Sequence, residues 1–265
     1  NQWRDFGWST NFTFSWNKNE IVELVHNYVH PETGELITKE RLEIKGLGKA
    51  KYILKPGGTL GDLYSNSDLV YNDDGYIEVD KNGNVAVKDD YMDDIYLGSV
   101  FPKYNLAWRN DFNYKGINLG VLFTARIGGI CYSATQANMD LYGVSEASAA
   151  ARDAGGVMIN GRDMIDAQKW YQVIGSQSGL PQYYTYSATN VRLQELSLGY
   201  TLPSKWFRDK MRMTVSFVGR NLWMIYCKAP FDPEAVASTG MNYQGIDYFM
   251  MPSMRNLGFN VKFQF

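Results

Sequence analysis

Strict alternation of apolar and polar residues marks several stretches of the chain, and the closing stretch, 255–265, shows it most clearly. Its apolar positions are Leu257, Phe259, Val261, Phe263 and Phe265; its other positions are Asn256, Gly258, Asn260, Lys262 and Gln264. On a strand these two sets lie on opposite faces. A soluble sheet would pack the apolar face on a core, whereas a transmembrane barrel would turn it to lipid and line its lumen with the polar face.

The same alternation recurs in five further segments and predicts an all-β, antiparallel protein. The predicted strands are 6–16, 103–114, 117–127, 191–200, 211–223 and 255–265. The tight turn at Tyr114-Lys115-Gly116 joins the second and third of them into a hairpin. Each strand has about ten residues, which a tilted membrane strand needs, and is roughly twice as long as an average strand of a globular protein.

Short and long connections alternate along the chain. Long segments at 17–102, 128–190 and 224–254 follow the first, third and fifth strands, and short turns follow the second and fourth. If the chain ends on the periplasmic side, every short turn is periplasmic and every long loop extracellular, as in outer-membrane barrels. Six strands are too few to close such a barrel, so we expect the chain to be one piece of it.

The long loops are predicted to contain structure of their own. Short strands are expected at 41–44 and 51–54, and helices at 145–152, with Ser145 as a possible N-cap, and at 163–174. No apolar run approaches the roughly 18 residues of a membrane helix. The chain begins at Asn1 without a signal-peptide pattern, so either that peptide has been removed or an N-terminal part of a longer protein is missing.

The amino-acid composition indicates which kinds of partner and ligand the chain could bind. Aromatic residues make up 15% of the chain, with 19 Tyr and 7 Trp, which is typical of proteins with aromatic girdles or sugar-binding surfaces. The net charge of −2 and the lack of a basic run argue against a nucleic-acid partner. No nucleophile elbow, HExxH motif or phosphate loop is present, so we do not expect an enzyme.

Four stretches, in the same order, resemble the C-terminal part of a SusC/RagA-type TonB-dependent outer-membrane transporter. They are Phe101-Pro-Lys-Tyr104 before the Asn113-Tyr-Lys-Gly116 turn, Val191-Arg-Leu-Gln-Glu-Leu-Ser-Leu-Gly-Tyr-Thr-Leu-Pro203, Gly219-Arg-Asn-Leu-Trp223 followed by Phe231-Asp-Pro-Glu234, and the terminal strand ending in Phe265. The second stretch and the Gly-Arg-Asn-Leu block are the specific ones. Many other outer-membrane proteins share a terminal Phe.

This resemblance implies a multi-pass barrel of about 22 strands in the outer membrane of a Gram-negative cell, plugged by an N-terminal domain. Residues 1–265 would supply the last six strands with their long extracellular loops, and the plug, the TonB box and the earlier strands would lie outside this chain. A SusD-like surface lipoprotein would cap the barrel and TonB would drive it. The cargo implied is an oligomeric nutrient, most often a glycan and sometimes a peptide.

Aromatic loop residues are candidates for ligand contact, because sugar rings stack on aromatic faces. The candidates are Trp170, Tyr171, Tyr183, Tyr184, Tyr186, Tyr243 and Tyr248. Arg126 and Arg220, which have the inward parity near the outer ends of their strands, are candidates for the lumen wall. The alternatives are that the aromatic residues pack the loops together or touch the lipoprotein, and that the arginines form salt bridges with neighbouring strands.

Two further clusters suggest minor sites. One loop segment concentrates oxygen ligands suited to Ca²⁺, namely Asp73, Asp74, Asp80, Asn82, Asn84, Asp89, Asp90, Asp93 and Asp94. Val85 stands where an EF-hand needs Gly, so a solvated hairpin loop is the favoured interpretation and no cofactor is expected. Cys131 and Cys227 follow the third and fifth strands, and only flexible loops would bring their thiols together in a disulfide.

A soluble β-sandwich that binds carbohydrate or acts as an adhesin is the alternative to the transporter. It would need a second sheet to cover the apolar face of the six strands, and the sequence shows no such sheet. The side chains concerned are Phe12, Trp16, Trp108, Val121, Phe123, Phe217 and Phe259.

Overall fold

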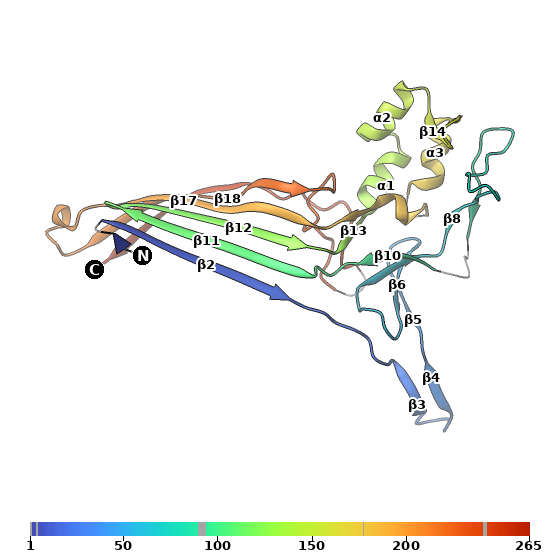
Figure 1. The fold of residues 1–265 in the computed structure, drawn as a ribbon, viewed down its shortest axis with the longest axis horizontal. Helices are drawn as coiled ribbons and strands as arrows, with labels where there is room; N and C mark the ends of the chain where they lie inside the picture. The colour runs from blue at the N-terminus through green and yellow to red at the C-terminus, as the bar shows by residue number, and fades with distance from the viewer. Residues whose placement is uncertain (1, 4, 90–93, 177, 241–242) are drawn as a thin grey trace.

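One long antiparallel sheet dominates the computed structural model, which describes residues 2–3, 5–89, 94–176, 178–240 and 243–265. Over these residues the sheet has seven strands, and their order across the sheet is the order in which they occur along the chain (Figure 1). They are β1 (Gln2–Trp3), β2 (Phe6–Trp16), β11 (Tyr104–Tyr114), β12 (Ile117–Ile127), β17 (Asn190–Thr201), β18 (Arg212–Cys227) and β20 (Asn256–Gln264). The six predicted strands are confirmed, with β18 running past its predicted end at 223.

Cross-strand pairing keeps the apolar side chains of neighbouring strands on a single face of the sheet. Trp108 of β11 lies opposite both Phe12 and Phe123, and its ring centroid is 6.1 Å from that of Phe123. At the other side of the sheet Phe217 packs edge-to-face on Phe259, with centroids 5.5 Å apart. Aromatic pairs directly opposite each other stabilise neighbouring strands by roughly 0.2–1 kcal/mol each.

The apolar face is uncovered within the described part of the chain. Phe12 is 63% exposed and Phe259 is 81% exposed, and none of the other described sheets packs over them. A soluble sandwich would bury such rings, so the second sheet that this alternative requires is not found among the described residues.

Bulges in β17 and β18 interrupt the period of two, which the sequence does not reveal. Where β12 pairs with β17, Leu122 lies opposite Glu195 and Phe123 lies opposite Leu193, so β17 has one extra residue at this point. The pairing of β17 with β18 shifts at the same place, between Leu193 and Glu195. An extra residue in one strand reverses the faces of the residues beyond it. Arg192 therefore lies on the polar face, although its even number matches the apolar set of Leu196 and Leu198.

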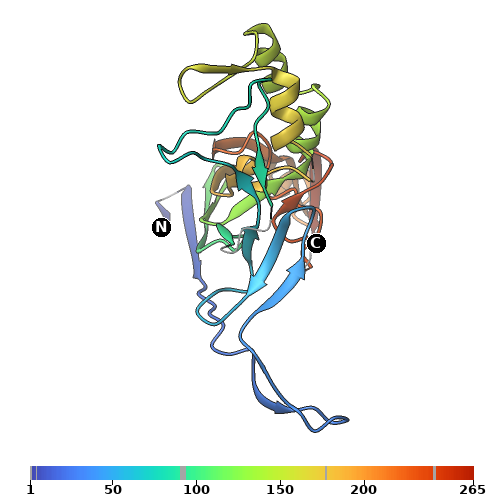
Figure 2. The ribbon, with the colours of Figure 1, turned by 90° about the vertical axis from the view of Figure 1, so that its right-hand side faces the viewer.

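The three long loops lie together at one end of the sheet and share one hydrophobic core (Figures 1 and 2). This loop body consists of the described residues of 41–101, 128–189 and 228–254, and its core includes Tyr52, Leu63, Tyr132, Ile165 and Ile246. Its two larger sheets are formed by β5 (Leu42–Lys45), β6 (Ala50–Leu54), β7 (Asp62–Ser65) and β10 (Ile95–Ser99), and by β13 (Ile130–Ser133), β16 (Thr185–Ser187) and β19 (Ile246–Asp247).

Small elements complete the loops. They are the hairpins β3 (Val25–Val29) with β4 (Leu36–Lys39), β8 (Asp68–Leu69) with β9 (Val87–Lys88), and β14 (Val157–Ile159) with β15 (Asp163–Ile165), and the short 3₁₀ turn Pro181–Tyr184. A second 3₁₀ turn, Ser204–Phe207, lies in the short connection between β17 and β18. Seen from the loop end, the β3–β4 hairpin projects on the side opposite the helices (Figure 2).

Three short helices lie in the second long loop. They are α1 (Ala134–Leu141), α2 (Glu146–Asp153) and α3 (Ala167–Ile174). Ser145 caps α2 as predicted, because its Oγ accepts the Ser148 N–H. The helix predicted at 163–174 begins only at Ala167, since Asp163–Ile165 pairs as β15, and α1 was not predicted. Among the described residues, no helix is long and apolar enough to cross a bilayer.

A charge on the apolar face should destabilise the sheet in a membrane, whereas the same charge on the polar face should not. We expect Phe217→Lys to cost about 2–4 kcal/mol in the intact protein folded into lipid vesicles, measured by urea unfolding. Ser216→Lys, one residue away on the opposite face, is the matched control and should cost less than about 1 kcal/mol. Equal losses for both variants would contradict a lipid-facing role for Phe217.

Candidate ligand-binding surface at the loop end of the sheet

The aromatic candidates divide into buried and accessible groups. Trp170 and Tyr184 are only 6% and 2% exposed and belong to the core of the loop body. α3 turns Ala167, Trp170 and Ile174 to that core, so the indole stabilises the loops from inside. Its ring lies edge-to-face against Tyr183, with centroids 5.8 Å apart, and so positions a tyrosine that reaches the surface.

The accessible aromatic side chains are those of Tyr183, Tyr243 and Tyr248, each about two-fifths exposed. Tyr186 is half-buried and packs edge-to-face on Phe231, with centroids 5.7 Å apart. Tyr171 is half-buried against the loop core. The structure thus leaves ring area free for a ligand at the first three positions and uses the others mainly for packing.

Arg220 belongs to a charge network on the polar face of the sheet. Its Nε donates to Glu195 Oε2 at 2.9 Å, and Arg109 Nη1 lies 3.3 Å from the other oxygen of the same carboxylate. Asp111 pairs with Arg109 at 2.9 Å. The network alternates in sign across β11, β17 and β18, so this face is suited to water or polar contacts and not to lipid.

A buried ion pair joins the sheet to the third long loop. Arg192 and Asp232 have side chains only 5% and 8% exposed, and the guanidinium is bidentate, with Nη2–Oδ1 at 2.8 Å and Nη1–Oδ2 at 3.1 Å. Arg192 also bonds Asn190 and Asn221 and lies 3.3 Å from Glu234. We call this set the Arg192 clamp. Sequence reasoning missed it, because the bulge that turns Arg192 inward has no local signal.

Ionisation of Asp232 is maintained by the clamp. Burial alone would raise the pKa of this carboxyl, but hydrogen bonds from Arg192, Ser253 and the Glu234 backbone N–H outweigh burial and hold its pKa below the usual range. The clamp is therefore a fully charged pair at neutral pH. It fixes residues 232–234 against the ends of β17 and β18.

Arg126 lies near the third loop as well. Its Nε donates to Asn105 Oδ1 at 3.4 Å, and its Nη1 is 4.0 Å from Glu234 Oε1. The guanidinium is about half exposed. Arg126 and the Arg192 clamp thus share Glu234, but Arg126 holds it loosely.

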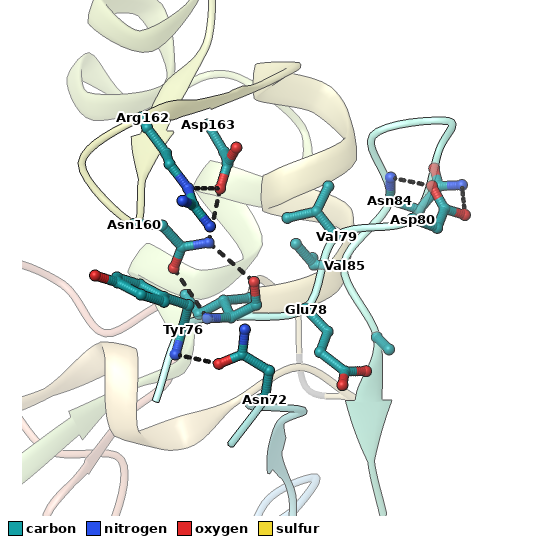
Figure 3. A pocket seen from close by; sticks show the side chains of 12 residues that line it. Asn72, Tyr76, Glu78, Val79, Asp80, Asn84, Val85, Asn160, Arg162 and Asp163 are labelled. Atoms are coloured by element: carbon teal, nitrogen blue, oxygen red, sulfur yellow. Dashed lines mark hydrogen bonds and ion pairs between the residues drawn. The ribbon is translucent and has the colours of Figure 1, made fainter. Parts of the chain in front are cut away.

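An open hollow of about 550 Å³ lies between the 70–86 segment and the second long loop (Figure 3). Arg162 covers the Tyr76 ring, with its guanidinium carbon 5.0 Å from the centroid. Asn160 holds the Ile77 backbone through two hydrogen bonds of 2.9 Å, one as acceptor and one as donor. The polar groups of this hollow mainly contact one another, and they fasten the 70–86 hairpin to the second loop.

The acidic cluster is engaged in protein contacts. Asp80 accepts from the backbone N–H groups of Asn84 and Asn82 and from the Asn84 side chain, all at 2.8 Å, and these bonds lower its pKa. Asp94 pairs with Arg41 at 2.6 Å and with Lys51 at 3.3 Å. Among the described residues, no group of three acidic, His or Cys side chains could hold a metal. Asp90 and Asp93 lie outside the described residues.

The two cysteines are both free thiols. Cys131 is buried in β13, where burial raises the pKa of its thiol to about 12. Cys227 ends β18, and its Sγ contacts the carbonyl oxygens of Ala229 at 3.5 Å and Phe231 at 3.7 Å. The structure therefore contains no disulfide between them.

Membrane-length strands with one uncovered apolar face, one charged face and large folded loops at one end define the wall of a transmembrane β-barrel. No protein-family model matches the chain. Two curated relatives from Formosa agariphila do. TonB-dependent receptor P3 is 25% identical in an alignment of 289 positions that covers 98% of this chain, and TonB-dependent receptor P39 is 23% identical in an alignment of 300 positions that covers 97% of this chain.

Two solved structures have the same fold as this chain. The RagAB peptide transporter matches with a TM-score of 0.59 at 16% identity over 99% of this chain, and the closed-closed state of the RagAB peptide importer matches with 0.58 at 17%. These comparisons confirm the resemblance to SusC/RagA-type TonB-dependent receptors and the fold of a transmembrane barrel segment. The relatives' names describe receptors and transporters, not enzymes. The chain spans 27% and 28% of the length of the curated relatives.

Breaking the Arg192 clamp should loosen the third loop. We expect Arg192→Met to cost about 3–5 kcal/mol of local stability, because it leaves the Asp232 carboxylate buried without its partner. Hydrogen exchange of peptides covering 228–240 in the intact receptor measures this. Arg162→Met removes an exposed pair and should cost less than about 1 kcal/mol. Unchanged exchange in 228–240 would contradict the clamp.

The clamp should also make stability depend on pH. A carboxyl whose folded pKa is depressed contributes stability above its ordinary pKa of about 3.9, and that contribution is lost as the pH falls through the lower folded value. We therefore expect the melting temperature of the intact receptor to fall below about pH 4, and to fall less in Asp232→Asn, which lacks the titrating group. Parallel pH profiles for the two proteins would refute this assignment.

Proposed function

We propose that this chain forms part of the wall and outer mouth of an energy-coupled importer in the outer membrane. The observation that carries the proposal is the cross-strand pairing of the six long strands, which builds an uncovered apolar face over a charged one, together with the three long loops at one end of the sheet. A lipid bilayer covers such an apolar face, and the charged face then lines a polar lumen. A soluble sandwich would cover this face with a second sheet, and the described residues form no sheet that does so.

The partners follow from the resemblance to SusC/RagA-type receptors. A SusD-like surface lipoprotein would close the outer mouth, and TonB would act through a part of the receptor outside residues 1–265. The cargo would be an oligosaccharide or an oligopeptide. The likeness to the RagAB peptide transporter supports such a lidded arrangement, and the names of the two curated relatives support coupling to TonB.

Within this arrangement the loop body would form a preorganised platform for cargo. Tyr183 and Tyr243 offer exposed rings, and Trp170, Tyr184 and Tyr186 hold the platform beneath them. Arg126 and Arg220 would face the cargo path from the strands. The shared core of the three loops favours a rigid platform over independent flexible loops.

Receptor-dependent uptake by whole cells tests the proposed function. Cells with and without the intact receptor gene are given a casein digest or a mixed polysaccharide hydrolysate, and depletion of each oligomer is followed by mass spectrometry. We expect depletion of one class that requires the receptor and stops when a protonophore collapses the energy supply. No receptor-dependent depletion, or an intact receptor that is a soluble monomer without detergent, would overturn the proposal.

A further inference from the structure

A small pocket of about 150 Å³ lies where the outer ends of β11 and β12 meet the third long loop. We call it the junction pocket. Its polar groups include Arg126 and Glu234, and its apolar lining includes Val100, Pro102, Ile130 and Val236. Pockets for whole drug-sized ligands have about 300–1,000 Å³, so a pocket of this size suits one residue of a longer ligand.

Arg126 has hydrogen-bonding capacity to spare in this pocket. A guanidinium carries five N–H donors, yet the contacts of Arg126 with other described residues are the 3.4 Å bond to Asn105 and the 4.0 Å approach to Glu234. Glu234 is about one-third exposed, and its Oε1 also lies 3.3 Å from Arg192. The N–H donors of Arg126 and the carboxylate of Glu234 therefore line the same small pocket, and each can form further hydrogen bonds.

The pocket walls are held in place without a ligand. Glu234 lies two residues after Asp232 of the Arg192 clamp, and its backbone N–H donates to Asp232 Oδ1 at 3.0 Å. On the other wall Gly245 accepts from the Tyr132 N–H at 2.9 Å, and a Cβ on Gly245 would lie 2.5 Å from Val100 Cγ1. Such close packing makes the site preformed, which lowers the entropic cost of binding.

The lining discriminates between classes of cargo. Sugar rings are held by aromatic platforms, and the described residues that line the junction pocket include no aromatic side chain. Valine, isoleucine and proline suit an aliphatic side chain. A peptide group has a carbonyl that can accept from Arg126 and an N–H that can donate to Glu234. It is also neutral, which suits a site where a positive and a negative side chain lie side by side.

We propose that the junction pocket binds one aliphatic residue of an extended peptide, whose carbonyl accepts from Arg126 and whose N–H donates to Glu234. This inference rests on the import function proposed above and assigns oligopeptide as the cargo. The clamp at Arg192 acts as a positioning device, because it fixes Glu234 at the pocket wall.

Retention of defined mixtures by the purified intact receptor in detergent tests the proposal. The probes are a casein digest and a polysaccharide hydrolysate that contains uronic acids, and retained species are identified by mass spectrometry. We expect peptides with Val, Leu or Ile to be enriched, and Arg126→Met to reduce their retention about tenfold, as loss of a charged hydrogen-bond donor predicts. Val236→Trp, which fills the pocket, should shift retention towards peptides rich in Gly and Ala.

Arg162→Met is the matched control, since it removes an arginine from the loop body outside the junction pocket and should leave retention unchanged. Heat resistance of each variant's β-sheet signal reports whether it folds. Retention of uronate glycans instead of peptides, or full peptide retention in folded Arg126→Met and Val236→Trp, would overturn the pocket assignment while the uptake assay still detects import. Absence of import in that assay overturns both proposals.

Discussion

Direct cross-strand pairing that keeps the apolar side chains on one face is the constraint on which the rest of the structure depends. Because side chains alternate with a period of two, a slip of one residue would exchange the two faces of a strand. Phe12, Trp108 and Phe123 share one face only in the observed register, as do Phe217 and Phe259. The continuous apolar face and the charged opposite face are two consequences of this one pairing.

The loops depend on the sheet for their positions, but they have a core of their own. Three segments far apart in the sequence contribute to it, and the parallel pairing of β13 with β19 joins the second loop to the third. The Arg192 clamp then fastens the third loop to the strand ends with a bidentate, nearly buried ion pair. A folded platform at one end of the sheet is thereby produced from three segments that share one core.

The candidate site could be predicted only in part. Exposed tyrosines at Tyr183 and Tyr243 agree with the loop placement expected from the sequence, and Arg126 and Arg220 lie on the expected face. Trp170, for which the sequence left ligand contact and loop packing open, lies in the core of the loop body. Whether an aromatic side chain in a loop is buried depends on which distant segments pack on it, and composition carries no such information.

The sequence by itself determined the six strands, their two faces and the alternation of long and short connections, because a period of two is a local property of neighbouring residues. Only the tertiary structure decided the bulge that turns Arg192 inward, the clamp to Asp232 and the approach of Arg126 to Glu234. Those features join residues tens to more than a hundred positions apart. Their energies arise from burial and charge pairing, which exist only after the chain has folded.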